Sequence, residues 1–494
     1  MAKADNLYFS RDTKVYVELL AANSNESGNI VWEIPVLDGY SFSQAQNASE
    51  VTLSEMESAT GESRRGRTMF NDSYAPAEWS FATYVRPFRS AGGTYGTPSG
   101  GVYPADIGSP SAGQGNVHAV EECLWALLAG GKYFDTSTTL NWINESGGTK
   151  ETTTTDATDL NISYQNSQTS TLGEVNIYFV LGATKASATS GITIGGSAEA
   201  AGQTDITLSS VTGIAVGDVL SAVITDGSTF NTVVLATPTD AGDTGSTPAT
   251  NTVTIGDALP EEFAASKALN FTRTATYKLE NCVVDSASVD FDIDGIATIN
   301  WSGLGKIIAQ AVPPTPTITE GIGSTTNFIR NRLTALDIST TASLDGETGS
   351  AVTYALTLTG GNITFSNNIA FLTPETLGSV NQPFAAIAGT RTIGGNFTCY
   401  LNTGDEGSGD LFSDLVGAST VITNNFDLVF NIGGKTASTN RLEVTCSNAH
   451  LELPTHSIDD VISVDVNFHA LPSTISGFDE AALKYIADTG NGNA

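Results

Sequence analysis

A run of alternating carboxylates comes nearest to a binding motif in this sequence. Asp290, Asp292, Asp294 and Gly295 match the opening of a calcium loop of the D-x-D-x-D-G type, in which carboxylate oxygens surround the ion. The twelfth position of that loop needs a glutamate, and Trp301 stands there instead. Because apolar residues alternate with the aspartates, the run also fits a strand with one acidic and one apolar face. We prefer the strand and predict no metal site.

Residues for catalysis are not grouped by any motif. The four histidines form no H-E-x-x-H pattern, and no serine has the flanking glycines of a nucleophile elbow. We therefore predict no catalytic residue and no cofactor. A glycan-processing enzyme stays an alternative, because its two carboxylates, about 5–10 Å apart, could come from distant segments. The sequence has 53 acidic residues and points to no such pair.

The charge of the chain excludes one broad class of function. Lys and Arg number 21 and Asp and Glu 53, which gives a formal charge of 21 − 53 = −32. Such a field repels nucleic acid and anionic membranes, so simple nucleic-acid binding is excluded. Arg64, Arg65 and Arg67 place three of the 21 positive charges in one loop. In so acidic a chain they predict docking against carboxylates of a neighbouring subunit, with a solvated loop as the alternative.

The composition predicts a β-rich chain with many turns. Of 494 residues, 15% are charged, 40% are hydrophobic and 50 are glycine, and polar stretches separate apolar alternations. No run approaches the roughly 18–20 apolar residues that span a bilayer, and we expect neither a membrane segment nor an export signal. The four cysteines lie far apart and are expected to be buried free thiols.

A strand and a helix recur at a constant spacing. A strand that ends at Pro87 precedes a short amphipathic helix around Trp125, and a strand that ends at Pro374 precedes a helix around Phe412. The two separations agree, since 374 − 87 = 287 and 412 − 125 = 287. This agreement predicts one fold repeated in tandem.

Later matches indicate where the two copies differ in length. Ile177 matches Leu428 at an offset of 428 − 177 = 251, and Ile299 matches Val466 at 466 − 299 = 167. The first step, 287 − 251 = 36, indicates an enlarged loop in the first copy, and the second, 251 − 167 = 84, indicates an insertion. The inserted text alternates with a two-residue period between turn signals, which predicts a small sandwich or barrel.

These offsets predict the domain organisation. The first copy is expected at 1–185 and 270–310, the inserted β domain at 186–269, a linker at 311–324, the second copy at 325–477 and a short tail at 478–494. The expected fold is mainly β (α+β), with a short helix flanking each copy.

Three segments of the two copies resemble tail tube proteins of long-tailed bacteriophages. They are RGRTMFNDSYAPAEWSFATYVRPF at 65–88, NNIAFLTPETL at 367–377 and LPTHSIDDVISVDVNFHALPS at 453–473. The likeness is greatest to siphophage proteins in which two tube domains are fused, and it does not extend to the inserted domain. In that family each tube domain is a β-sandwich or half-barrel with a flanking helix. Two-domain chains form trimeric rings of pseudo-sixfold symmetry, and the rings stack into a hollow tube.

The resemblance implies a structural, self-assembling protein and not an enzyme. Its partners would be further copies of itself and the tape measure, tail terminator and tail tip proteins, while viral DNA would pass through without specific binding. The expected place is the tail of a non-contractile virion, after assembly in the host bacterial cytoplasm and with no membrane partner. An exported β-rich surface adhesin or layer protein is the alternative, although it should carry an export signal.

We expect carboxylates that repel DNA phosphates to line such a channel. The candidates are Asp290, Asp292, Asp294, Asp459, Asp460 and Asp465. Alternation around Asp465 supports its place, because Val464, Val466 and Phe468 share the opposite face of the predicted strand.

Overall fold

The computed structural model describes 8–25, 28–52, 67–89, 116–135, 142–143, 151–156, 158–164, 172–183, 189–225, 229–238, 251–272, 274–311, 313–318, 328–340, 352–376, 380–417, 426–436, 439–458, 461–475 and 477–487. Among these residues the fold is mainly β, as predicted, with two α-helices, α1 (Glu122–Leu128) and α2 (Ser408–Gly417), and two short 3₁₀ helices, η1 (Ala21–Asn23) and η2 (Asn331–Leu333). No helix in this described part is long and apolar enough to cross a membrane.

Strands make up most of the described chain. In chain order, the first seventeen are β1 (Tyr8–Leu19), β2 (Ile30–Ile34), β3 (Ser41–Thr52), β4 (Arg67–Tyr84), β5 (Pro87–Arg89), β6 (Val117–Ala119), β7 (Tyr133–Phe134), β8 (Trp142–Ile143), β9 (Glu151–Thr155), β10 (Leu160–Ser163), β11 (Val175–Ala183), β12 (Thr189–Thr193), β13 (Asp205–Thr207), β14 (Val219–Val223), β15 (Thr229–Ala236), β16 (Thr252–Ile255) and β17 (Ala268–Thr272). The others are β18 (Thr274–Asp292), β19 (Thr298–Gly305), β20 (Ile307–Gln310), β21 (Ala335–Thr340), β22 (Thr353–Ala355), β23 (Leu358–Ser366), β24 (Ala370–Leu372), β25 (Ala385–Ile387), β26 (Thr392–Tyr400), β27 (Phe426–Ile432), β28 (Arg441–Leu451), β29 (Thr455–Ile458), β30 (Ile462–Ala470) and β31 (Ala482–Ile486).

The chain divides into two compact units. The smaller comprises Met1–Tyr16, Ile177–Lys278 and Ala309–Pro316, and the larger comprises Val17–Asn176, Leu279–Ile308 and Thr317–Ala494.

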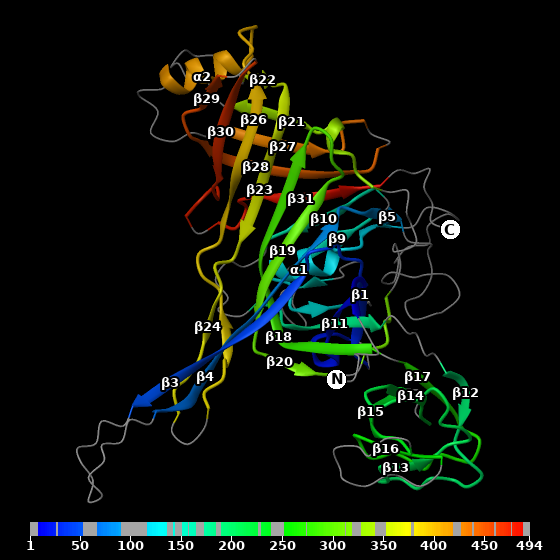
Figure 1. Ribbon diagram of the computed structural model, residues 1–494. Coiled ribbons are helices and arrows are strands. Elements are labelled where there is room, and N and C mark those ends of the chain that lie inside the picture. The colour runs from blue at the N-terminus through cyan, green and yellow to red at the C-terminus, as the bar shows by residue number, and fades with distance from the viewer. Residues whose placement is uncertain are drawn as a thin grey trace, which may run out of the picture. The chain divides into compact units, whose positions relative to one another are not determined.

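One antiparallel sheet runs through the larger unit, and we call it the shared sheet (Figure 1). Its strands pair in the order β3–β4–β19–β18–β23–β26–β30–β29. The pairing of β18 with β23 joins the segment predicted as the first copy to the segment predicted as the second. Residues 286–292 of β18 lie opposite 360–366 of β23 without a break in register.

The strand order of the shared sheet repeats once. The order β3–β4–β19–β18 in the first half returns as β23–β26–β30–β29 in the second, and β1 pairs with β11 as β21 pairs with β27. Helices α1 and α2 follow β4 and β26 at corresponding places, which agrees with the helix offset of 287.

The strand offset of 287 is wrong. Tyr84 of β4 lies opposite Thr298, and Thr398 of β26 lies opposite Asp465, which is 465 − 298 = 167 residues beyond Thr298. The counterpart of β4 is therefore β26, at an offset of 398 − 84 = 314. The segment around Pro374 instead contains β24, which pairs with β25 in a separate two-stranded hairpin. Two apolar runs that end in proline look alike in sequence, and only cross-strand register distinguishes them.

The shared sheet curls over at β28, where Ala449–Leu451 pair with β30. The layer beyond this curl packs on the apolar face of the shared sheet, and we call it the second sheet. Its strands pair in the order β9–β10–β31–β28–β27–β21. The rings of Phe430 on β27 and Phe468 on β30 lie 5.3 Å apart between centroids, so the two sheets meet there in a common core. Near β19, helix α1 fills the core, with the Trp125 ring 4.8 Å from Trp301 and 5.2 Å from Phe365.

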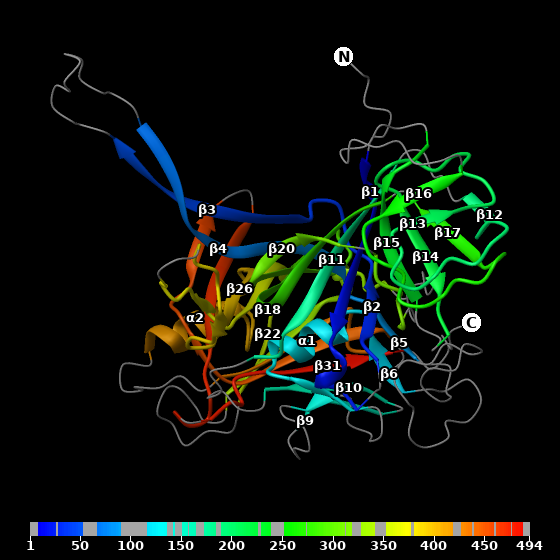
Figure 2. The same cartoon turned by 90° about the horizontal axis from the view of Figure 1, so that it is seen from below.

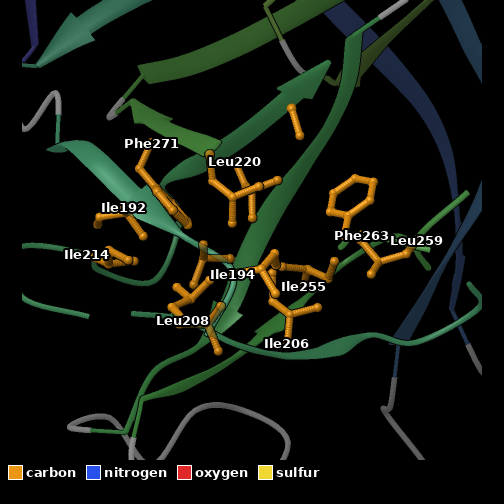
Figure 3. Packing of buried hydrophobic residues seen from close by; sticks show 14 residues of the cluster. Ile192, Ile194, Ile206, Leu208, Ile214, Leu220, Ile255, Leu259, Phe263 and Phe271 are labelled. Atoms are coloured by element: carbon orange, nitrogen blue, oxygen red, sulfur yellow. The ribbon is translucent and has the colours of Figure 1, made fainter. Parts of the chain in front are cut away.

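The residues between β11 and β18 form a small closed barrel in the smaller unit. Six strands pair in the order β12–β17–β14–β15–β16–β13, and a bridge between Ile194 and Leu208 connects the two ends. Figure 3 shows its core, in which the aromatic rings of Phe263 and Phe271 pack with Leu220 and further aliphatic side chains. The segment thus has its own sheet and its own core, while the boundaries 186–269 stay a prediction. The four cysteines are free and buried, as expected from the sequence.

Glycines let the middle strands of the shared sheet approach closely. A Cβ atom on Gly395 of β26 would lie 1.9 Å from the Asn362 carbonyl oxygen of β23, and one on Gly303 of β19 would lie 2.1 Å from the Val283 carbonyl oxygen of β18. Neither site has room for a side chain. Such positions allow a sheet to twist and curl sharply.

We expect Gly395→Ala to lower the free energy of unfolding by about 1–3 kcal/mol, because the new methyl group forces the backbones of β23 and β26 apart. Denaturant unfolding measures the loss. Gly360→Ala is the matched control, since its Cβ would first meet an atom at 3.4 Å, and it should change stability by less than about 1 kcal/mol. Equal losses for both variants would contradict the close-approach argument.

Candidate functional site

The shared sheet presents one face that is polar along its length, and we call it the polar face. Its side chains come from alternate positions of seven strand segments, 41–44, 78–84, 286–292, 298–305, 360–366, 392–398 and 463–469. The other positions of these segments carry the core, where Ile299, Ile363 and Val466 are fully buried. Two-residue alternation in the sequence therefore separates the two faces.

Hydroxyl groups form one row across this face. The row runs over six strands through Ser41, Ser80, Ser302, Ser286, Ser366 and Thr392, which are paired in register. The hydroxyl oxygens of Ser41 and Ser80 lie 2.8 Å apart, and those of Ser286 and Ser302 also lie 2.8 Å apart. We call this set the hydroxyl row.

A second row carries amides and one carboxylate. Asp290, Asn362, Asn396 and Asn467 lie opposite one another on β18, β23, β26 and β30, and we call them the amide row. The side-chain amides of Asn300 (2.6 Å) and Asn362 both donate to the Asp290 carboxylate. This carboxylate is therefore held by neutral donors within one protein surface.

The polar face is hollowed and carries no basic side chain of lysine or arginine. Depressions of 760, 500 and 270 Å³ open on it, the largest around Asn396, Asn467 and His469. Within its seven strand segments the acidic residues are Glu78, Asp290, Asp292 and Asp465, and neither lysine nor arginine occurs. A surface of this kind offers no cation to exchange counterions with a phosphate backbone.

The structure brings three of the predicted acidic residues onto this face. Asp290 and Asp292 lie on β18, and Asp465 lies on β30, where the Thr398 hydroxyl donates to it at 3.2 Å. Asp294 lies in the turn after β18, with its carboxylate 3.9 Å from the Arg332 guanidinium. Asp459 and Asp460 are outside the described residues.

Of the three arginines in the predicted basic loop, only Arg67 is among the described residues. Arg64 and Arg65 lie outside the described residues. Arg67 is the first residue of β4, and its guanidinium lies 3.6 Å from the Glu50 carboxylate of the paired strand β3. This ion pair is exposed, so it contributes little to stability.

Sequence reasoning missed most of the polar face. Glu78 on β4 was not a candidate, nor was Glu452, which accepts from Asn467 at 2.9 Å and lies 3.1 Å from the His469 ring nitrogen. These donors hold the pKa of Glu452 below its usual value. Alternation with apolar residues places Asn467 and Ser302 on polar faces, but it does not show which strands pair to form the hydroxyl and amide rows.

The same acidic residues are the candidates for a metal site. In the part of the chain that the structure describes, no three His, Cys, Asp or Glu side chains are placed to hold a metal ion. The D-x-D-x-D-G run is strand only as far as Asp292, and Asp294 and Gly295 lie beyond the strand, so the preferred strand interpretation holds for the first part of the run alone.

A second group of ionisable side chains is buried at the start of α1. The Tyr485 hydroxyl donates to Glu121 at 2.7 Å and accepts from the Trp125 indole at 2.7 Å. His118 lies 2.9 Å from the Glu122 carboxylate. Burial raises the pKa of Glu121 to about 7, although the Tyr485 hydroxyl and the Arg86 backbone oppose the shift. Because this group is sealed in the core, it stabilises the fold and reaches no substrate.

The fold is β-rich, and its open sheet repeats its strand order internally. No family model matches the chain. The chain is similar to the tail tube protein pb6 of Escherichia phage T5, with 23% identity over 488 residues that cover 97% of this chain and 76% of the relative. This relative confirms the resemblance to siphophage tail tube proteins. The relative is a structural protein of the tail tube.

We expect the free energy of unfolding to fall as the pH rises from about 5 to 8, because Glu121 must lose its proton inside the core. Its pKa is about 7 in the fold against 4.5 in an unfolded chain, so its contribution is complete below pH 4.5 and lost through pH 7. The loss is up to about 3 kcal/mol. Urea unfolding at a series of pH values measures it.

Glu121→Gln should flatten this pH dependence, since the amide does not titrate. Glu78→Gln, which changes an exposed carboxylate, is the matched control and should keep the wild-type slope. A slope that survives in Glu121→Gln would show that another group is responsible.

Proposed function

We propose that the chain is the structural subunit of a phage tail tube, in which three chains close a ring of pseudo-sixfold symmetry and the rings stack around a channel. The observation that carries this proposal is the shared sheet, whose strand order repeats and whose terminal strands, β3 and β29, each pair on one side only within the described residues. Open sheet edges of this kind invite pairing with another chain.

The internal junction supports a specific way to close the ring. Within the chain, β18 of the first copy pairs with β23 of the second. The repeat makes β29 the counterpart of that part of β18, and the start of β3 the counterpart of β23. The same junction between two chains therefore joins β29 of one to the β3 region of the next. Three chains would contribute 3 × 8 = 24 strands to a closed barrel, which has no edges.

The polar face suits the inner wall of this barrel. DNA must slide along a wall without adhering to it, and the carboxylates of Asp290, Asp292 and Asp465 repel phosphates. Ser286 and Ser302 are hydrogen-bonded within the hydroxyl row, and the amides of Asn300 and Asn362 donate to Asp290. This leaves a wetted surface that binds no phosphate strongly. Asp294, Asp459 and Asp460 stay proposals for the rim of the channel, and Arg64, Arg65 and Arg67 for contacts between subunits.

Two hairpins support stacking of rings along the axis. Strands β3 and β4 run on as a long hairpin (Figures 1 and 2), and Tyr74 of β4 donates its backbone N–H to Asn381, between β24 and β25, at 2.9 Å. Together they form what we call the arm. Its apolar side chains include Met69, Phe70 and Phe384, which are 65%, 55% and 69% exposed. Apolar exposure of this size is typical of a contact surface.

The remaining assignments follow from this proposal. The domain boundaries 1–185 with 270–310, 186–269, 311–324, 325–477 and 478–494 belong to it. So do the tape measure, tail terminator and tail tip partners, a non-contractile tail, and the absence of catalysis. A surface adhesin is the competing function, and it would keep β3 and β29 as free edges in a monomer.

Electron microscopy of the purified chain at several concentrations tests the proposal. We expect rings and hollow tubes with threefold or pseudo-sixfold projections. The double variant Phe70→Ser with Phe384→Ser should give rings that do not stack, whereas Val223→Ser on the barrel of the smaller unit should stack normally. Monomers that stay monomeric after tail tip components are added would favour the adhesin.

Lysine substitutions test the polar face as the channel wall. Asp290→Lys should make assembled tubes retain short duplex DNA, with binding that weakens steeply between about 50 and 200 mM salt. Asp257→Lys makes the same charge change at an exposed site on the small barrel and should retain none. If both variants retain DNA equally, or neither does, the polar face does not line the channel.

A further inference from the structure

The C-terminal strand β31 lies between the two copies in the second sheet. On one side it pairs with β10, from Leu160 opposite Tyr485 to Ser163 opposite Ala482. On the other it pairs with β28, from Arg441 opposite Ile486 to Thr445 opposite Ala482. The strand therefore joins a segment of the first copy to a segment of the second. From the sequence this region was expected only to be a short tail.

Side chains of β31 alternate between the core and the surface. Leu483 and Tyr485 point inward and are 1% and 0% exposed, while Ala482 is exposed. The Tyr485 hydroxyl lies in the buried group at the start of α1, where it donates to Glu121 and accepts from Trp125. The inward side of β31 is thus fixed to the helix of the first copy.

Charged groups hold the same segment on both sides. The Lys484 ammonium lies 2.7 Å from the Asp159 carboxylate, at the start of β10. The Glu480 carboxylate accepts from Arg391, which precedes β26, at 2.5 Å. The Arg89 guanidinium donates to the Ala487 carbonyl oxygen at 3.0 Å. The first copy thus holds Lys484 through Asp159 and the Ala487 carbonyl oxygen through Arg89. The second copy holds Glu480 through Arg391.

The corresponding place in the first copy is built differently. There the chain leaves β19, pairs with β18 as β20, and then hydrogen-bonds to β2, where Thr317 donates to the Val31 carbonyl oxygen at 2.9 Å. That segment stays within its own copy. Bridging is therefore a property of β31 and not a necessity of the repeated fold.

The copies share several contacts besides β31. Strands β18 and β23 pair, the Trp125 ring lies 5.2 Å from Phe365, and Tyr74 donates its backbone N–H to Asn381. Pairing of β31 adds a backbone junction in the other layer, about 10 Å away across the sandwich, and this junction opposes bending about the β18–β23 pair.

We propose that β31 is a latch that sets the angle between the two copies and so determines whether a chain can enter a ring. This inference rests on the proposed function for its link to rings, but the latch itself is a property of the single chain. Its partners are internal: the edges of β10 and β28, the Trp125 indole and the Asp159 carboxylate.

Two C-terminal truncations of the chain test the latch. One variant ends at residue 487 and keeps β31, and the other ends at residue 477 and lacks it. Hydrogen exchange on the unassembled chain measures how well the backbone amides of each strand are protected. We expect the shorter chain to lose about tenfold or more of the protection of β10 and β28 amides, while β4, β19, β23 and β26 keep theirs. The chain that ends at 487 should match the wild type in all six strands.

A peptide of residues 478–487, added to the shorter chain, should restore both the protection of β10 and β28 and the formation of rings. Point variants give a second measure where truncation prevents folding. Leu483→Lys should release the strand, whereas Ala482→Lys adds the same charge at an exposed neighbour and should not.

The outcomes separate the latch from the proposed function. Loss of protection together with loss of rings supports both. Loss of protection in β10 and β28 with rings formed as in the wild type would overturn the control of ring entry. Unchanged protection would overturn the latch altogether. If the wild-type chain forms no rings with or without tail tip components, the proposed function fails while exchange still reports on the latch.

Discussion

Hydrogen bonding between strands that are far apart in sequence is the constraint on which this structure depends. Each half of the chain contains a four-stranded group that would be open at both sides if it stood alone. Pairing of β18 with β23 satisfies one edge of each group within the chain and leaves β3 and β29 as the outer edges. An unpaired edge is a liability unless a partner covers it, so the same physics that joins the halves also calls for neighbours. The self-assembly proposed above uses these edges and needs no dedicated binding pocket.

The two-residue alternation of the strands was readable from the sequence, and what depends on alternation was predicted well. Val464, Val466 and Phe468 are fully buried, and Asp465 lies on the opposite face, as the pattern indicated. The helix around Trp125 is also present and ends just before Gly130, which adopts a left-handed conformation with φ of 102°. The helix is not amphipathic as predicted, because all its residues from Glu122 to Leu128 are buried. Local periodicity is sufficient for such features because each depends on neighbours within a few residues.

Features that depend on register were not predictable in this way. The strand around Pro374 resembles the strand before Pro87, yet it lies in the β24–β25 hairpin, because its hydrogen bonds are made with Ala385–Ile387. The polar rows could not be assembled for the same reason: Ser286 and Ser366 are far apart in sequence and become neighbours only through the pairing of β18 with β23. Strand β31 is short, and the sequence does not show that its inward residues pack between β10 and β28. A single sequence contains the alternation of a strand but not the identity of its partner.

The small barrel shows how the repeated fold accepts a large insertion. Its first and last strands, β12 and β17, are antiparallel neighbours, with Thr193 opposite Ala268, so the barrel begins and ends at adjacent points. An insertion with adjacent ends can replace a hairpin turn between β11 and β18 without changing the separation of those strands. The bridge from Ile194 to Leu208 closes the barrel, which has a hydrophobic core of its own. Closure also removes its edges, so the barrel adds surface to the chain without competing for the pairing of β3 and β29.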